Sequence, residues 1–269
     1  MLVLGAGLWL FSIRSAWQET RVVFLAVGEG DALLITQGTY QILIDAGREG
    51  KTTLSHLGKF MPFYDHTIEA VVVTHPDADH IGGFPEVFKH YRVGAIFLTG
   101  AKSETDTVEL LEREISRRAH GKEHPVIAGT KIEFPRGGSW SVLFPAAPVP
   151  ERVTETNATS IVSRFEYGST SFLLTGDLPD EEEYLPSVQT AEVLKVAHHG
   201  SRSSTSDTWL SLVRPKTAII SVGENRYGHP APEVLERLTE RGIEIIRTDE
   251  RGDIVYRCRN QWRGCQRMR

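Results

Sequence analysis

The sequence lacks several features that would have identified its class at once. Only two of its 269 residues are cysteine, so a dense disulfide scaffold or a cysteine-rich zinc ribbon is excluded. Lys and Arg (30) do not exceed Asp and Glu (35), unlike in a dedicated nucleic-acid binder. A nucleic-acid substrate stays possible, because bound cations invert the local field of a carboxylate-rich site. After residue 13 no apolar run reaches membrane-spanning length.

The two cysteines, Cys258 and Cys265, lie near the C-terminus. A disulfide in an oxidising compartment and two free thiols on a frayed tail are both open readings. We expect residues 259–269 to form a basic tail, because arginine is frequent there and the ends of domains are often poorly ordered.

The first 13 residues are uncharged and mostly apolar, and Arg14 follows them. This run is too short to span a bilayer of roughly 30 Å, and it lacks the basic start and cleavage site of a signal peptide. A signal anchor, the end of a longer membrane helix and a buried core segment are the alternatives. We favour the second, so residues 1–18 are expected to be the end of a membrane helix or an anchor.

The hydrophobic pattern predicts a strand-rich stretch followed by strand–helix alternation, and this order occurs twice. Residues 69–74 form a nearly all-apolar strand, of the kind that is buried on both faces. The predicted strands cover 21–27, 32–36, 41–45, 69–74, 94–99, 131–134, 139–144, 160–166, 170–175, 192–197, 216–222, 243–248 and 252–257, and the predicted helices 52–60, 84–91, 104–119, 205–213 and 231–241. This order favours an α+β fold with two face-to-face sheets and outer helices, as one domain over residues 19–258.

Metal-capable side chains are concentrated directly after the strand at 69–74, as His75, Asp77, Asp79 and His80. If the loop is extended, positions 75, 77 and 79 converge on one point and position 80 reaches a neighbouring one. This spacing suits two metal ions that share a loop. The alternative is a solvated loop in which an Asp merely caps the next helix.

Two further strand ends carry polar residues of the same kind. Asp177 follows the strand at 170–175, and His198 and His199 follow the strand at 192–197. Taken singly, Asp177 would be a turn residue and the histidine pair a structural feature. Three such clusters in one chain instead predict a metal-dependent hydrolase.

This combination of motifs resembles the metallo-β-lactamase superfamily, whose αββα four-layer sandwich holds a dinuclear metal site between its sheets. The superfamily motif His-x-His-x-Asp-His becomes His75-x-Asp77-x-Asp79-His80 here, with Asp in place of the second His. With Ile81-Gly82-Gly83 and His198-His199-Gly200-Ser201, this departure is similar to the C-terminal nuclease-type domain of ComEC-type competence proteins. Other matching segments, in family order over about 20–256, are 27–32, 43–47, 157–160, 174–177 and 227–230.

The resemblance implies a role for each matching residue. His75 and Asp77 would bind one metal ion, Asp79 and His80 the other, and Asp177 would bridge them. His199, or else His198, would be the last ligand. The implied metal ligands are thus His75, Asp77, Asp79, His80, Asp177 and His199; the implied catalytic residues are Asp79, Lys195, His198 and His229; and the implied substrate contacts are Asn157, Ser160 and Ser201.

Three of the implied catalytic residues, Lys195, His198 and His229, are candidates for contact with phosphate or for protonation of the leaving group. Two of them have a structural alternative. Lys195 could extend from its strand to solvent, and His229 before Pro230 could cap the next helix.

A ligand set of His and carboxylate without Cys permits zinc, and Asp at position 77 favours manganese. The resemblance implies a nuclease that degrades the non-transported strand during DNA uptake in transformation. Its expected partners are single-stranded DNA and the membrane channel part of the same or a neighbouring protein, on the extracytoplasmic side. Two alternatives are a small phosphodiesterase of the phosphorylcholine-esterase kind and a non-catalytic domain that guides DNA.

Overall fold

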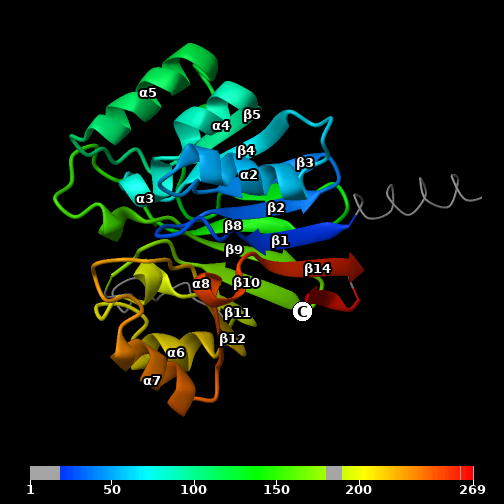
Figure 1. The fold of residues 1–269 in the computed structure, drawn as a ribbon, viewed down its shortest axis with the longest axis vertical. Helices are drawn as coiled ribbons and strands as arrows, with labels where there is room; N and C mark the ends of the chain where they lie inside the picture. The colour runs from blue at the N-terminus through cyan, green and yellow to red at the C-terminus, as the bar shows by residue number, and fades with distance from the viewer. Residues whose placement is uncertain (1–18, 180–189, 261, 269) are drawn as a thin grey trace, which may run out of the picture.

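The computed structural model describes residues 19–179, 190–260 and 262–268. The predicted membrane segment at 1–18 lies outside the described residues. Within the described ranges, two sheets pack face to face, and helices cover the outer face of each (Figure 1). This four-layer α+β sandwich confirms the predicted fold class. No helix in the described ranges is long and apolar enough to cross a membrane.

The first sheet carries the N-terminal strands and also the C-terminal ones. It is antiparallel from β15 to β3 and parallel from β3 to β6, and α2, α4 and α5 lie on its outer side (Figure 1). Its strands, in spatial order, are β15 (Gly264–Arg267), β14 (Ile254–Asn260), β1 (Thr20–Phe24), β2 (Leu33–Gln37), β3 (Tyr40–Ile44), β4 (Thr67–Val73), β5 (Arg92–Leu98) and β6 (Glu123–Pro125). The helices are α2 (Gly50–Phe60), α4 (Phe84–His90) and α5 (Asp106–Arg118), and the short α3 (Ala78–Ile81) follows β4.

The second sheet is antiparallel from β7 to β10 and parallel from β10 to β13, with α6 and α7 outside it. Its strands, in spatial order, are β13 (Glu244–Arg247), β12 (Thr217–Ile220), β11 (Val193–Lys195), β10 (Thr170–Leu174), β9 (Val162–Tyr167), β8 (Ser139–Phe144) and β7 (Lys131–Glu133). The helices are α6 (Asp207–Val213) and α7 (Pro232–Glu240), and α8 (Thr248–Arg251) leads from β13 back to β14 of the first sheet.

Both faces of the central strands are buried, which explains their nearly continuous apolar sequences. In β2 and β3, Ile35 and Ile42 join the core between the sheets, whereas Leu34 and Leu43 join the core under the outer helices. Since successive side chains of a strand point to opposite faces, this alternation fixes the register of each strand. The register in turn fixes where each strand ends and where the residues after it lie relative to the neighbouring strands.

The parallel strands of both sheets end at the same edge of the sandwich. Beyond these ends lie Asp45 after β3, Thr74 and His75 after β4, Asp177 after β10 and His199 after β11. Crevices at the carboxyl ends of parallel strands are common ligand sites. The fold thus brings the three predicted strand-end clusters together.

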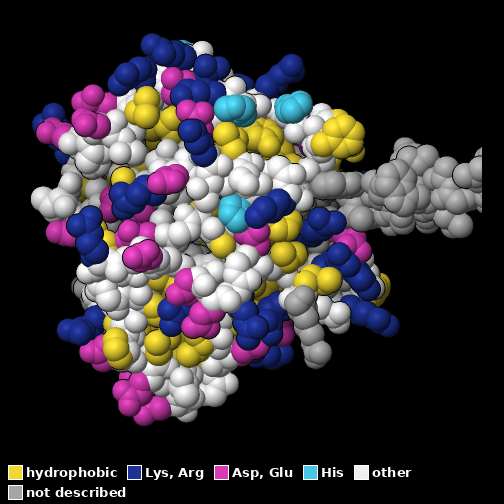
Figure 2. All heavy atoms as spheres, in the orientation of Figure 1, with side chains coloured by type: hydrophobic (Ala, Val, Ile, Leu, Met, Phe, Trp, Pro, Cys, Tyr) yellow, Lys and Arg dark blue, Asp and Glu magenta, His cyan; other side chains and the backbone are white. Residues whose placement is uncertain are grey.

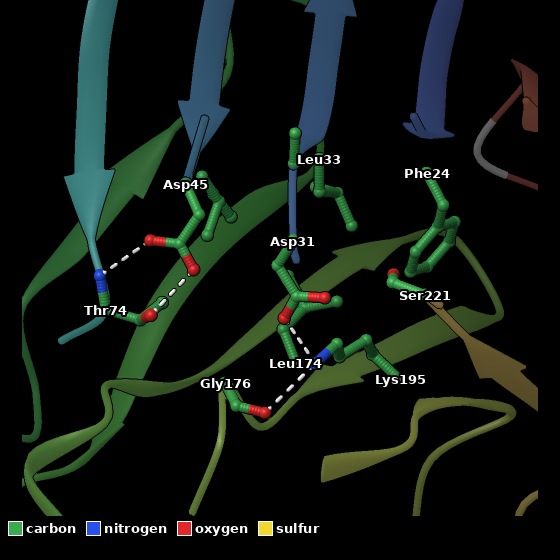
Figure 3. A pocket seen from close by; sticks show the side chains of 11 residues that line it. Phe24, Asp31, Leu33, Asp45, Thr74, Leu174, Gly176, Lys195 and Ser221 are labelled. Atoms are coloured by element: carbon green, nitrogen blue, oxygen red, sulfur yellow. Dashed lines mark hydrogen bonds and ion pairs between the residues drawn. The ribbon is translucent and has the colours of Figure 1, made fainter. Parts of the chain in front are cut away.

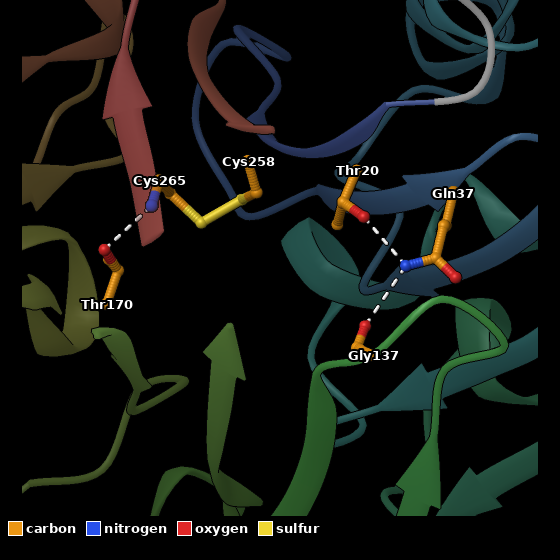
Figure 4. Close-up of a disulfide and its surroundings, with 6 residues drawn as sticks. All are labelled: Thr20, Gln37, Gly137, Thr170, Cys258 and Cys265. Carbon is orange, nitrogen blue, oxygen red and sulfur yellow. Dashed lines mark hydrogen bonds between the residues drawn. A yellow bond between two sulfur atoms is a disulfide. The ribbon is translucent and has the colours of Figure 1, made fainter. Parts of the chain in front are cut away.

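The opposite edge of the sandwich is closed by hydrogen bonds between the sheets, next to a disulfide within the first sheet (Figure 4). Cys258 and Cys265 face each other on β14 and β15 and form a disulfide, and Cys265 N donates to Thr170 Oγ1 of β10 (2.9 Å). Gln37 Nε2 donates to Thr20 Oγ1 (2.8 Å) and to Gly137 O (3.1 Å). The tail predicted over 259–269 is therefore mostly sheet, because the hairpin pairs along β14 and is anchored to β10.

We expect the double substitution Cys258→Ser, Cys265→Ser to lower the free energy of unfolding by about 2 kcal/mol. The cross-link joins residues seven apart, and a short closed loop removes about this much chain entropy from the unfolded state. Urea unfolding of the oxidised protein and of the variant measures the difference. Metal content is the control and should not change, and equal unfolding midpoints would contradict the prediction.

Candidate metal centre

Three buried histidines each have Nδ1 held by a neighbouring oxygen. His80 Nδ1 lies 2.8 Å from Asp45 Oδ2, and His199 Nδ1 lies 2.9 Å from Ser221 O. His75 Nδ1 lies 3.0 Å from Thr74 Oγ1, which can accept because its own proton goes to Asp45 Oδ2 (2.6 Å). A histidine that donates from Nδ1 keeps its lone pair on Nε2, as metal-ligating histidines do.

The Nε2 atoms of these histidines point at carboxylate oxygens. Asp177 Oδ2 lies 3.2 Å from both His80 Nε2 and His199 Nε2, and Asp79 Oδ2 lies 3.4 Å from His199 Nε2. The Nε2 atoms of His75, His80 and His199 are buried and have no hydrogen-bond partner among the residues that the structure describes. Lone pairs and carboxylates repel each other unless a cation lies between them. These orphaned atoms therefore fit a metal ion.

Asp79, His80, Asp177 and His199 form one group whose ligand atoms all lie within 4.8 Å of one another. Two imidazoles and two carboxylates without a thiolate are ligands suited to zinc and manganese. His199, rather than His198, belongs to this group. All four residues are among the predicted metal ligands.

The electrostatics of the group favour a cation. Burial by itself lowers the pKa of His80, yet the charges of Asp177 and Asp45 raise it well above its usual value. Burial likewise opposes the effect of Asp177 on His199, whose pKa rises to about 10. Burial raises the pKa of Asp177, but the His199 and His80 charges hold it well below its usual range. Any cation, a proton or a metal ion, is stabilised there.

His75 and Asp77 lie beside this group rather than within it. The rings of His75 and His80 are 4.1 Å apart, and His75 Nε2 lies 3.9 Å from Asp77 Oδ2. Asp77 is fixed by Thr156, whose Oγ1 donates to Asp77 Oδ1 (2.6 Å). This pair could hold a second ion next to Asp177, so all six predicted ligands meet at one place.

Three predicted residues form the mouth of the centre. His198 Nε2 lies 3.9 Å from Asp177 Oδ2 and 3.4 Å from Asn157 Nδ2. The His229 ring lies 5.4 Å from the His198 ring, and burial together with the positive charge of His198 lowers the His229 pKa. His198 and His229 are positioned to contact a substrate, and Asn157 orients His198.

Lys195 does not lie where contact with phosphate was predicted. Its side chain is only 5% exposed, forms an ion pair with Asp31, and donates to Gly176 O (3.0 Å) (Figure 3). Its Nζ also lies 3.7 Å from Asp177 Oδ1. The strand β11 runs under the centre, so the side chain points into a small cavity with apolar walls (Figure 3). Lys195 thus neutralises a buried carboxylate below the ligands.

The predicted substrate contacts Ser160 and Ser201 also have supporting positions. Ser160 is fully buried, and its Oγ accepts from Asp177 N (3.1 Å). Ser201 is nearly buried, with its Oγ 3.2 Å from Ser203 Oγ, and its N–H donates to His198 O (2.8 Å). Both serines hold ligand-bearing turns in place, because the turn after each strand needs partners for its backbone groups.

Asp45 and Asp31 received no role from the sequence. Asp45 is buried and accepts from Thr74 N (2.9 Å) and Thr74 Oγ1 (Figure 3). It also accepts from His80 Nδ1, so it orients two histidines. Asp31 pairs with Lys195 and lies 3.6 Å from His199 Nδ1. The available signal was their position: Asp45 follows a buried strand just as Asp177 does, within a segment that matches the family.

Two glycines let neighbouring turns clamp the metal-binding loop. Gly30 has a φ of +116°, and a Cβ there would collide with Asp79 O. A Cβ at Gly83 would collide with Ala46 O. Only glycine permits such close approach of two backbones. The turns at 28–31 and 45–47 therefore pack closely against the segment 79–83, which contains the end of the metal-binding loop.

Comparison with known proteins points to one superfamily. Residues 25–224 match the family model described as the Metallo-beta-lactamase superfamily. Among solved structures, the metallo-beta-lactamase fold protein YhfI from Bacillus subtilis superposes with a TM-score of 0.60, over 89% of this chain and 99% of that one. Its sequence identity is 13%, so this likeness concerns the fold.

Curated relatives are more similar in sequence. The chain is 33% identical to ComE operon protein 3 of Bacillus subtilis, over 94% of this chain and 35% of that protein. It is 31% identical to Recombination protein 2 of Haemophilus influenzae (84% and 27%) and 28% identical to Competence protein ComA of Neisseria gonorrhoeae (88% and 32%). The chain thus spans about a third of the length of these relatives.

We expect Asp45→Asn to lower metal affinity roughly 10- to 100-fold, because a neutral amide no longer fixes the His80 tautomer and ring. Titration with zinc or manganese against a competing chelator measures the affinity. Asp253→Asn is the matched control, since Asp253 forms an Asp–His pair with His56 (2.7 Å) outside the centre. Equal affinities of Asp45→Asn and Asp253→Asn would show that Asp45 does not orient a ligand.

We expect Lys195→Met to lower the free energy of unfolding by about 3–5 kcal/mol, since it leaves the Asp31 carboxylate buried beside Asp177 without its cation. Urea unfolding of the metal-free protein isolates this effect. Lys216→Met is the control, because Lys216 pairs with Glu192 at the surface, and its unfolding midpoint should stay that of the wild type. A Lys195→Met variant as stable as the wild type would contradict the buried ion pair.

Proposed function

Because the chain belongs to the metallo-β-lactamase superfamily, we propose that it is a metal-dependent phosphodiester hydrolase, the nuclease domain of a ComEC-type DNA-uptake protein. The observation that carries the proposal is a set of three orphaned histidine Nε2 atoms beside carboxylates. Those of His80 and His199 face Asp177 at 3.2 Å, and that of His75 faces Asp77. The curated relatives, one of them named a competence protein, support the role in DNA uptake.

The residues of the centre would hold one divalent ion on Asp79, His80, Asp177 and His199, and a second beside His75 and Asp77. Such ions lower the pKa of bound water and neutralise the charge of a phosphodiester. The carboxylate of Asp77 favours manganese, and zinc is the alternative. His229, whose lowered pKa keeps its imidazole neutral near pH 7, would accept a proton or a hydrogen bond at the mouth.

Two observations bear on where the domain acts. The described residues contain a disulfide between Cys258 and Cys265, which suits an oxidising compartment. The relatives are about three times as long as the aligned region. We therefore place the domain on the extracytoplasmic side, next to a membrane channel part and in contact with the incoming DNA.

We expect the purified protein to cleave single-stranded DNA with manganese or zinc, and Asp79→Ala to reduce cleavage to background, because that variant loses a ligand of the four-residue group. Gel assays on a labelled oligonucleotide measure the rate. Asp106→Ala is the control, because Asp106 is an exposed residue at the start of α5, and this variant should cleave as the wild type does.

The alternatives give different results in the same assays. Turnover of bis(4-nitrophenyl) phosphate with no DNA cleavage would replace the nuclease with a small phosphodiesterase. Binding of DNA by a protein that retains no metal would replace it with a DNA-guiding domain. Absence of DNA cleavage with both metals would sink the nuclease proposal.

A further inference from the structure

An open pocket adjoins the metal centre and leads away from it over the surface. Two of its lining residues, Asp77 and Asp79, belong to the centre. The outer part of the lining includes Arg48, Arg152 and Tyr227. A group bound in this pocket would therefore lie beside whatever is bound at the metal ions.

Tyr227 is a large aromatic side chain that the fold leaves 69% exposed. Its ring stacks on the His229 ring, with 5.7 Å between centroids and an interplanar angle of 25°. The backbone under it is fixed by Asn225. Asn225 Oδ1 accepts from Tyr227 N (3.1 Å) and His229 N (3.0 Å), while Nδ2 donates to Gly223 O (2.9 Å) and His229 O (2.8 Å).

This preorganised and exposed ring contributes little to the core. Its orientation is set before any ligand arrives, so binding to it costs little conformational entropy. Every nucleobase has an apolar face that stacks on an aromatic ring in this way. The geometry thus suits a planar group placed next to the metal centre.

The pocket also has positive charge within reach of a phosphate. Arg48 is half-exposed, and its guanidinium lies 3.9 Å from Asp79 Oδ1. Arg152 is exposed and also lines the pocket. The Lys102 ammonium is already paired with Glu112 (2.9 Å) and Glu151 (2.8 Å). Arg48 is held less closely than Lys102, by one contact at 3.9 Å, so Arg48 and Arg152 are the side chains suited to phosphate contact.

We propose that this pocket is a subsite for one unpaired base of a nucleic-acid strand, stacked on Tyr227, with Arg48 and Arg152 contacting the neighbouring phosphates. The proposal rests on the proposed function, since it requires that a strand reaches the metal centre. A base in a duplex is already stacked on its neighbours, so the subsite selects single strands.

Binding of fluorescein-labelled oligothymidylate, followed by anisotropy in EDTA, tests the subsite without catalysis. We expect Tyr227→Ala to weaken binding about tenfold and Tyr227→Phe to bind within about twofold of the wild type, since stacking needs the ring and not the hydroxyl. Tyr64→Ala is the matched control: Tyr64 is 60% exposed on the loop before β4, at the other end of that strand from the centre. It should bind as the wild type does.

A second measurement separates stacking from charge. For Arg152→Gln, the dependence of log affinity on log salt concentration should become shallower by about 0.7, the value for one lost phosphate contact on a single strand. Tyr227→Ala should leave this slope unchanged. The same variant should also show a smaller preference for oligothymidylate over a hairpin duplex than the wild type does.

The outcomes distinguish the two proposals. If the wild type binds and cleaves single strands and Tyr227→Ala does so equally well, the subsite is wrong and the nuclease proposal stands. If the wild type holds metal and hydrolyses the small diester but neither binds nor cleaves DNA, the nuclease proposal is wrong and the subsite falls with it.

Discussion

The metal centre depends on one constraint: a neighbouring oxygen holds the Nδ1 atom of each of three buried histidines, which leaves each Nε2 atom to face a carboxylate of the centre. Asp45 is the hub of this constraint, because it holds His80 directly and His75 through Thr74. The backbone carbonyl of Ser221 does the same for His199 from the other sheet. Each anchor follows the end of a parallel strand, so the packing of the two sheets positions the three imidazoles.

Charge balance explains why such a centre requires a cation. Asp31, Asp45, Asp79 and Asp177 lie close together, and Asp31, Asp45 and Asp177 are buried. Lys195 supplies one positive charge from below, where it pairs with Asp31. Four carboxylates and one ammonium leave an anionic centre, and burying unpaired charge is costly. Divalent ions on the free Nε2 atoms would remove both the charge excess and the unsatisfied lone pairs.

Hydrophobic periodicity was sufficient to predict most of the fold. Every predicted strand and helix has a counterpart in the structure, because the strands alternate between two buried faces or are apolar throughout. What it could not predict is which strand ends face each other. The strands predicted at 243–248 and 252–257 are consecutive in the chain, yet β13 and β14 lie in different sheets. The short β6 and β15 were missed because few of their side chains are buried.

The site residues likewise divide into those that the local sequence pattern predicts and those whose positions depend on how the sheets pack. His75, Asp79 and Asp177 could be predicted because each follows an apolar strand, a pattern that is visible in the sequence. Lys195 was a candidate for phosphate contact and Ser160 an implied substrate contact, both through the resemblance to the family. In the structure, Lys195 forms an ion pair with Asp31, which belongs to the other sheet's side of the sandwich. Ser160 Oγ instead accepts a hydrogen bond from Asp177 N in the turn after β10. Such contacts depend on tertiary packing rather than on local pattern.

The mouth and the proposed base subsite share one support. The four hydrogen bonds of Asn225 fix both His229, which faces the metal ligands, and Tyr227, which faces the pocket. Because the two rings stack on each other, a base that stacks on Tyr227 extends a column that ends at His229, whose ring meets that of His198 edge to face. The position of the neighbouring phosphate is then set relative to the metal ligands by rigid contacts. Placement of this kind is the main contribution that a protein scaffold makes to metal-assisted hydrolysis.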